Sequence, residues 1–227
     1  MKLIKTASLV LSQMKYKDTS LIVRMFTQKL GLRSYIINGV RSEYNKSNKI
    51  ALFQPLNWLE MVAYESASYS LHRIKEVKIL YSYQSIPYNH HKTLIGIFLI
   101  DFLNNILKEE DANEKLFDFL KNSLFEFDSL SHQYSDFHLQ FLLKIPDFLG
   151  FGIEKVSDIK KEIPQWEVLD NEQLEILQML LSENFGVKTS LNGTLRTQFL
   201  ELLLLFFQKH IEGFGKLNSI DILKDLS

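Results

Sequence analysis

Six cationic side chains lie between residues 24 and 56, together with tyrosines and phenylalanines and with Glu43 as the single acid. They are Arg24, Lys29, Arg33, Arg41, Lys46 and Lys49. Ammonium and guanidinium groups bind phosphate, and Tyr and Phe rings stack on nucleobases. The mixture therefore indicates a polyanion that carries aromatic bases. A purely structural role is the alternative, because Lys on a strand edge also discourages sheet aggregation.

The net charge of −1 conceals a difference between the two parts of the chain. Residues 1–80 carry 13 Lys and Arg against 5 Asp and Glu, whereas the remainder carries 13 against 22. Such a split is typical of two modules, one of which faces a polyanion. A solvated basic surface without a ligand would give the same counts.

The candidate phosphate contacts are cations that flank the strands and the loop expected in this basic part. They are Lys15, Lys17, Arg24, Lys29, Arg33, Arg41, Lys46 and Lys49. Tyr16, Tyr35 and Tyr44 are the candidate stacking residues, although a core position is favoured for Tyr35. Binding of this kind tolerates many base sequences and weakens as salt rises.

Signals for covalent chemistry are weak. Residues 213–217 read GFGKL, with Leu where a phosphate-binding loop needs Ser or Thr. No sequence motif indicates a general base that could activate a Ser or Thr nucleophile. The absence of cysteine excludes disulfides and thiolate metal sites, and the six histidines lack ligand spacing. We therefore expect a protein that is not an enzyme and that holds no metal and no cofactor.

Neither the N-terminus nor any apolar run indicates secretion or a membrane span. The opening stretch MKLIKTASLVLSQMK shows no signal-peptide pattern, and the apolar runs at 94–100 and 202–207 are too short to cross a bilayer. We expect a cytoplasmic protein.

Five strands rich in β-branched and aromatic residues are expected between positions 1 and 80. They are Ser8–Tyr16, Ser20–Thr27, Leu32–Asn38, Leu56–Tyr64 and Ser68–Val77. Residues 38–49 are polar and long enough for a loop. Five short strands with one long loop are typical of a Greek-key barrel of the OB-fold type.

From about Pro87 the apolar period becomes helical. Helices are expected at 91–107, 113–127, 136–150, 171–184 and 194–215, with the third bent or ended near Pro146 and with residues 150–170 irregular. The expected fold class is α+β. A five-stranded OB-fold barrel at residues 1–80 is followed by an all-α helical domain at residues 81–227.

Two stretches resemble the RecO recombination-mediator family. In the first, residues 11–41, the matching residues follow the order of the family's opening strands and turns: Tyr16, Asp18, Phe26, Thr27, Gly31, Gly39 and Arg41. LFQPL at 52–56 looks like the family's step into the next strand. In the second, residues 203–223, His210, Leu217 and Ser219 stand where the closing helix and tail have them. The resemblance spans nearly the whole chain.

The resemblance implies a mediator of bacterial DNA repair that is not an enzyme. Such a protein binds single- and double-stranded DNA, anneals complementary strands, and acts with RecR to help load RecA. It also contacts the acidic, apolar C-terminal tail of single-strand-binding protein, for which the candidate residues are Lys115, Lys121, Lys144 and Arg196. Arg41 becomes the strongest candidate for DNA contact, because it closes the family's Gly-x-Arg step.

Two other functions remain open. The runner-up is an RNA-binding OB-fold protein in translation or RNA turnover, and the third possibility is a scaffold whose barrel binds another protein. The basic charge of the barrel is compatible with all three functions, whereas the resemblance of the C-terminal tail within residues 203–223 favours the mediator.

One departure from the family concerns zinc. Many members carry a four-cysteine zinc site after the element that corresponds here to Leu149–Phe151, but this chain has no cysteine. We therefore expect no zinc, and we expect Trp166 and Ile163 to hold the following segment by packing.

Overall fold

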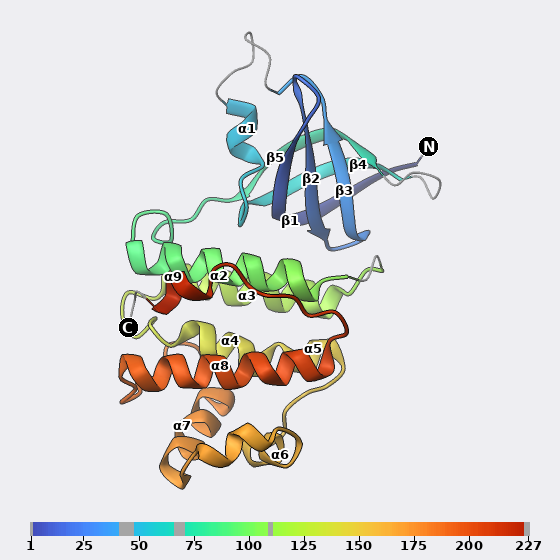
Figure 1. The fold of residues 1–227 in the computed structure, drawn as a ribbon. Coiled ribbons are helices and arrows are strands. Elements are labelled where there is room, and N and C mark those ends of the chain that lie inside the picture. The colour runs from blue at the N-terminus through green and yellow to red at the C-terminus, as the bar shows by residue number, and fades with distance from the viewer. Residues whose placement is uncertain (1, 41–47, 66–70, 109–110, 225–227) are drawn as a thin grey trace. The chain divides into compact units, whose positions relative to one another are not determined.

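A computed structural model describes residues 2–40, 48–65, 71–108 and 111–224 of the protein (Figure 1). The chain forms two compact units. The barrel unit consists of Met1–Ser82 and Ile100–Phe117, and the helical unit consists of Tyr83–Leu99 and Asp118–Ser227. Whether residues 1–80 and 81–227 are separate domains stays a prediction.

The barrel unit is built on five strands closed in the order β1-β2-β3-β5-β4. Their bounds are β1 Lys2–Tyr16, β2 Ser20–Thr27, β3 Gly31–Ile37, β4 Trp58–Glu65 and β5 His72–Tyr81. A short helix, α1 (Asn48–Leu52), lies between β3 and β4 in the chain and begins inside the region that the sequence suggests is a loop. The predicted α+β class with an N-terminal OB-fold barrel is confirmed.

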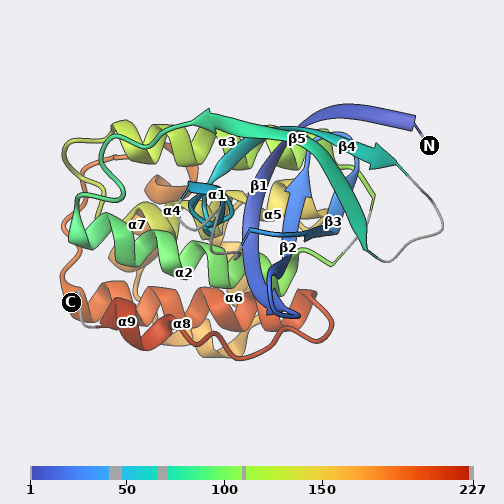
Figure 2. The same cartoon turned by 90° about the horizontal axis from the view of Figure 1, so that it is seen from above.

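The first strand is long and bent, and its two halves pair with different neighbours (Figures 1 and 2). Lys2–Leu9 pairs with β4, and Ser8–Tyr16 pairs with β2, with a register shift between Val10 and Ser12. A bulge of this kind bends a strand and increases its twist. The strand therefore begins at Lys2, well before Ser8, where the sequence pattern places its start.

The barrel interior is filled by residues that face each other across the strands. Val23 pairs with Tyr35, and Leu21 pairs with Ile37. Residues directly opposite one another point to the same side of a sheet. Val23, Met25 and Tyr35 are each 0% exposed, so this side is the core.

The remaining helices are α2 His90–Ile106, α3 Glu114–Ser129, α4 Phe137–Lys144, α5 Pro146–Leu149, α6 Val156–Glu162, η2 Pro164–Val168, α7 Asn171–Ser182, α8 Gly193–His210 and α9 Ile220–Lys224. In the helical unit α4 contacts both α7 and α8 (Figure 1). α4 ends before Pro146, as expected. Within the described residues, no helix is both long and apolar enough to cross a membrane.

A buried polar anchor joins two segments of the helical unit. The Asp128 carboxylate accepts hydrogen bonds from the backbone N–H groups of residues 84–86 at 2.8–2.9 Å. The Lys92 ammonium, 1% exposed, donates to the carbonyl oxygens of Phe127 and Asp128 in the last turn of α3 and of Leu130 just after it. Cations at a helix C-terminus satisfy its free carbonyl groups. The anchor therefore fixes the entry to α2 against the end of α3.

Candidate nucleic-acid interface

The turn after β1 brings predicted phosphate-binding and stacking residues together. Lys15 and Lys17 are exposed on either side of the half-buried Tyr16. The Lys17 Nζ lies 5.4 Å from the centre of the Tyr16 ring. In OB-folds the loop between the first two strands commonly borders the oligonucleotide site. A cation beside an aromatic ring, with the exposed Lys15 next in the chain, can hold a phosphate and its base.

Arg24 lies on the outer side of β2, but its guanidinium is engaged within the barrel unit. Nη1 donates to the carbonyl oxygen and side-chain Oδ1 of Asn104 at 3.1 and 3.2 Å, and Nη2 donates to the carbonyl oxygen of Leu107 at 2.6 Å. Burial also lowers the pKa of this guanidinium. The structure thus gives Arg24 a different role from the predicted phosphate contact: it caps the C-terminus of α2.

Tyr35 lies in the barrel core at 0% exposure. Burial raises the pKa of its hydroxyl, and the nearby Arg33 charge partly opposes this rise. The ring is therefore not available for stacking on a base, and the favoured core position is the one observed. Arg33 is half-buried and donates from Nη1 to the Leu32 carbonyl oxygen at 2.9 Å.

Lys29 is exposed in the turn between β2 and β3. β2 separates this turn from Lys17 by eight residues, or about 25 Å at about 3.3 Å per residue. The structure therefore does not gather Lys29 with Lys15 and Lys17. Arg41, Tyr44 and Lys46 lie outside the described residues, and Lys49 belongs to α1.

Other Lys and Arg residues of the barrel contribute to the excess of positive charge in residues 1–80 but are not among the predicted phosphate contacts. Lys5 and Lys78 both pair with Glu60, at 3.0 and 2.8 Å. The hydrogen bonds from Lys78 and Lys5 lower the pKa of Glu60, and the bond to Glu60 raises the pKa of Lys78. Arg73 and Lys75 are exposed on β5. Alternation in the β5 sequence is the signal that could have found these last two.

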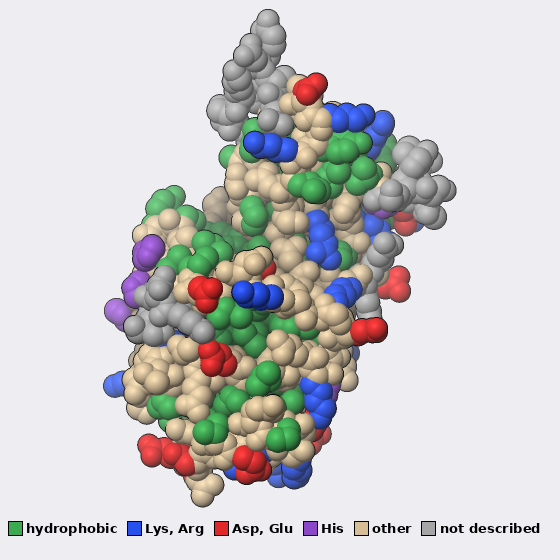
Figure 3. Space-filling view, viewed as in Figure 1, with side chains coloured by type: hydrophobic (Ala, Val, Ile, Leu, Met, Phe, Trp, Pro, Cys, Tyr) green, Lys and Arg blue, Asp and Glu red, His purple; other side chains and the backbone are tan. Residues whose placement is uncertain are grey.

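Lys and Arg side chains are spread over the visible face of the barrel strands among hydrophobic and uncharged groups (Figure 3). Such a surface differs from a continuous cationic stripe. It offers separate phosphate contacts with apolar surface between them, which suits single strands with accessible bases.

The four candidate residues for a partner tail have different surroundings. Lys115 is exposed in the barrel unit, and the other three belong to the helical unit. Lys144 donates to the Leu181 carbonyl oxygen, and burial lowers the pKa of its ammonium. Arg196 forms an ion pair with Asp136 at 2.7 Å. Lys121 is half-buried, with its Nζ 5.9 Å from the Phe125 ring centre.

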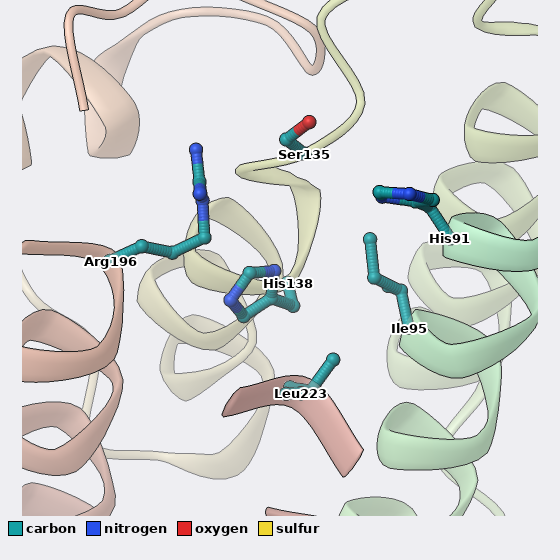
Figure 4. Close-up of a pocket in the computed structure, with 6 residues that line it drawn as sticks. All are labelled: His91, Ile95, Ser135, His138, Arg196 and Leu223. Atoms are coloured by element: carbon teal, nitrogen blue, oxygen red, sulfur yellow. The ribbon is translucent and has the colours of Figure 1, made fainter. Parts of the chain in front are cut away.

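A small cavity in the helical unit contains the buried His138 (Figure 4). The side chains around it are His91, Ile95, Ser135, His138, Arg196 and Leu223. Its volume is about 20 Å³, which suffices for one water molecule. Burial lowers the pKa of His138 to about 4. Among the described residues its Nδ1 has no hydrogen-bond partner. A cavity of this size cannot take a substrate.

The residues present do not fit the four-cysteine zinc site expected from the family resemblance. The chain has no cysteine, and the described residues include no group of His, Asp and Glu that could hold a metal ion. The segment after α5 forms α6 and η2, whereas the sequence predicts irregular structure there. Trp166 is fully buried and donates from Nε1 to the Leu202 carbonyl oxygen at 3.1 Å. Ile163 is also buried, at 5% exposure, so packing holds this segment.

Comparison with known proteins identifies the family. Residues 1–83 match the family described as Recombination protein O N terminal, and residues 88–162 match Recombination protein O C terminal. The chain is 32% identical to the DNA repair protein RecO of Christiangramia forsetii, with 99% of both chains covered. It is 35% and 34% identical to the RecO proteins of Flavobacterium johnsoniae and Flavobacterium psychrophilum, with 98% of each chain covered. The chain therefore belongs to the RecO family of DNA repair proteins.

Proposed function

We propose that this chain is a recombination mediator in bacterial DNA repair. It binds single- and double-stranded DNA through its barrel and anneals complementary strands. With RecR it helps to load RecA on strands coated by single-strand-binding protein. The protein acts by binding and positioning DNA rather than by covalent chemistry, and it works in the cytoplasm at the nucleoid.

The observation that carries the proposal is the OB-fold barrel with Lys15, Tyr16 and Lys17 at its first turn, in a chain that matches RecO proteins over 98–99% of its length. Lys29, Arg33, Arg41, Lys46 and Lys49 are further proposed phosphate contacts, and Tyr44 is a further proposed stacking residue. Arg24 and Tyr35 are not included, because one caps a helix and the other lies in the core.

Salt titration of single-strand binding tests the electrostatic part of the proposal. If about five phosphates are neutralised, the slope of log affinity against log salt is about −3.5. Raising salt from about 50 to about 200 mM then weakens binding on the order of a hundredfold. A parallel titration with RNA of equal length distinguishes the mediator from an RNA-binding barrel protein, because tighter binding to RNA contradicts the proposal.

Annealing is tested with two complementary strands coated by single-strand-binding protein. Neutralising phosphates lowers the repulsion between strands, and base pairing drives their union. The full chain is expected to accelerate duplex formation, and a Lys15→Gln/Lys17→Gln variant is expected to do so less. An unchanged rate in the presence of the wild-type chain would exclude annealing.

The proposed partner contact is tested with the C-terminal tail peptide of single-strand-binding protein. We place this contact near Lys115 or Lys121, because Lys144 and Arg196 already have internal partners. Charge reversal at Lys115 and Lys121 should then weaken peptide binding more than reversal at Lys188, another cation of the helical unit. Equal binding by all variants would contradict this placement.

A further inference from the structure

A groove crosses the barrel unit where β3, α1 and β5 approach one another. Its volume is about 350 Å³, which lies within the range of small-ligand sites. Ile36 of β3, Leu52 of α1 and Ile74 of β5 contribute to its apolar wall. Asn38, Arg73 and Lys75 contribute polar groups. The groove is thus an apolar slot with an amide and two cations.

The sheet topology explains why the barrel has a groove here. In the described part of the chain, β3 and β5 pair at two positions, Tyr35 with His72 and Ile36 with Arg73. Beyond Ile36 no further pairing joins the two described strands, and the neighbouring residues Ile37 and Asn38 line the groove instead. Leu52, the last residue of α1, also lines the groove, so this helix borders it. The groove therefore follows from the short parallel pairing in the fold.

The two cations of the groove are available for an anion. Arg73 and Lys75 are both exposed and alternate along β5. The Arg73 guanidinium has no ion-pair or hydrogen-bond partner among the described residues, and the Lys75 Nζ lies 3.7 Å from its neighbour Glu76. An exposed pair of this kind is weak. Lys78 on the same strand differs, because Glu60 binds it at 2.8 Å.

We propose that this groove takes an unstacked base of a single strand, while Arg73 and Lys75 contact the adjacent phosphates. This inference rests on the proposed function and specifies where the barrel reads single-stranded DNA. The apolar wall covers the faces of the base. The Asn38 Oδ1 accepts a hydrogen bond from Ser20 Oγ at 3.1 Å, which leaves its Nδ2 to donate to the polar edge of the base. A base in a duplex is paired and stacked, so it enters only at the cost of unstacking. The groove should therefore favour single strands over duplexes.

Charge favours a nucleic acid over a protein segment as the occupant. An apolar peptide would also suit Ile36, Leu52 and Ile74, but it has no need of two exposed cations at the rim. A nucleotide carries both a flat apolar face and a phosphate. The basic surplus of residues 1–80, with 13 Lys and Arg against 5 Asp and Glu, supports the same choice.

The first experiment separates base contact from phosphate contact. Binding of oligo(dT) is compared with binding of an equally long chain of abasic deoxyribose phosphates. Stacking of one base changes affinity by about five- to a hundredfold, so the wild-type chain should prefer oligo(dT) by at least about fivefold. Ile36→Ser should remove most of this preference, because it takes away part of the apolar wall.

Ile22→Ser is the matched control for this experiment. Ile22 pairs with Ile36 across β2 and β3, is also half-buried and does not line the groove. The control should keep the preference for oligo(dT). A preference that survives in Ile36→Ser, or that falls equally in both variants, overturns the proposal.

The second experiment tests the two cations. Arg73→Gln/Lys75→Gln should lower single-strand affinity about tenfold and reduce the salt slope by about 1.4, because each lost phosphate contact contributes about 0.7. Lys2→Gln/Lys78→Gln removes the same charge from cations that already pair with Glu65 and Glu60. Equal losses in the two double variants would show a general charge effect and overturn the proposal.

Cross-linking with the wild-type chain covers the case in which a variant fails to fold. A single strand with a photoreactive diazirine on one base should label peptides that contain Ile36–Asn38 or Arg73–Lys75. Labelling confined to other peptides overturns this inference but leaves the proposed function intact. Failure of the wild-type chain to bind any oligonucleotide contradicts the proposed function itself.

Discussion

Arg24 is held by two residues of the same compact unit, with Asn104 and Leu107 as acceptors. Arg24→Met removes these bonds and leaves the carbonyl oxygens at the end of α2 without their donor. Hydrogen bonds to charged groups contribute about 1.5–3 kcal/mol each. We expect the free energy of unfolding in urea to fall by about 2–3 kcal/mol, with little change in DNA affinity. Lys17→Met should show the opposite pattern, and a larger loss of DNA affinity in Arg24→Met would contradict the capping role.

His138 makes the stability of the protein depend on pH. Its pKa of about 4 lies below the ordinary value of 6.5, because burial disfavours the charged form. Asp136 partly opposes this shift, and Arg196 adds to it. The unfolded chain therefore takes up a proton at a higher pH than the folded chain does. The stability contribution is complete above pH 6.5, falls as pH drops toward 4, and amounts to about 3 kcal/mol at most.

His138→Phe should flatten the pH dependence of stability between pH 6.5 and 4. Urea unfolding at closely spaced pH values measures this, with His132→Phe as the control because His132 is exposed. A slope that is equal in the two variants would show that other groups cause the acid destabilisation.

At the scale of elements, local signals predict some strands and helices well and others poorly. β2 begins and ends where its β-branched run does, from Ser20 to Thr27. The start of β1 is not predicted by the local pattern. Its first half pairs with β4, a strand distant in the sequence, and Thr6, for example, lies opposite Met61. The N-cap of α7 is Asp170, which forms a capping box with Gln173.

The candidate site is predictable in part for the same reason. Composition indicates Lys15, Tyr16 and Lys17, which are neighbours in the chain. The acceptors of Arg24 lie 80 and 83 residues away, so only the fold shows that this cation is engaged. Arg73 and Lys75 come within reach of Ile36 and Leu52 through strand order, which no local pattern reveals.

The segment from α6 to η2 is stabilised by packing without zinc, and this leads to a prediction about metal removal. A strong chelator should leave the melting temperature unchanged. Trp166→Ala should lower stability by about 3–5 kcal/mol, as expected for a large buried aromatic. Trp166→Phe should cost less, since it loses mainly the hydrogen bond to Leu202. A chelator-induced drop in melting temperature would reveal a metal that these residues do not explain.

At the scale of the whole molecule, the barrel depends on residues that follow it by many positions. Phe117 packs against Trp58 and Phe26, with ring centres 5.4 and 6.0 Å apart. A fragment of residues 1–83 lacks this ring and the acceptors of Arg24. We expect that fragment to unfold at a lower temperature than a fragment of residues 1–117, measured by circular dichroism. Equal melting temperatures would show that the shorter fragment is a self-sufficient domain.

The bent first strand has a mechanical consequence for the closed barrel. Since β1 bonds to β2 along one half and to β4 along the other, the two ladders overlap near Ser8 and Leu9, where the strand is paired on both sides. The pairing of β3 with β5 has only two paired positions in the described barrel, so we expect it to be the seam at which strands first separate. Amide protons in the middle of β1 should consequently be the last to exchange with solvent, and those flanking the seam the first.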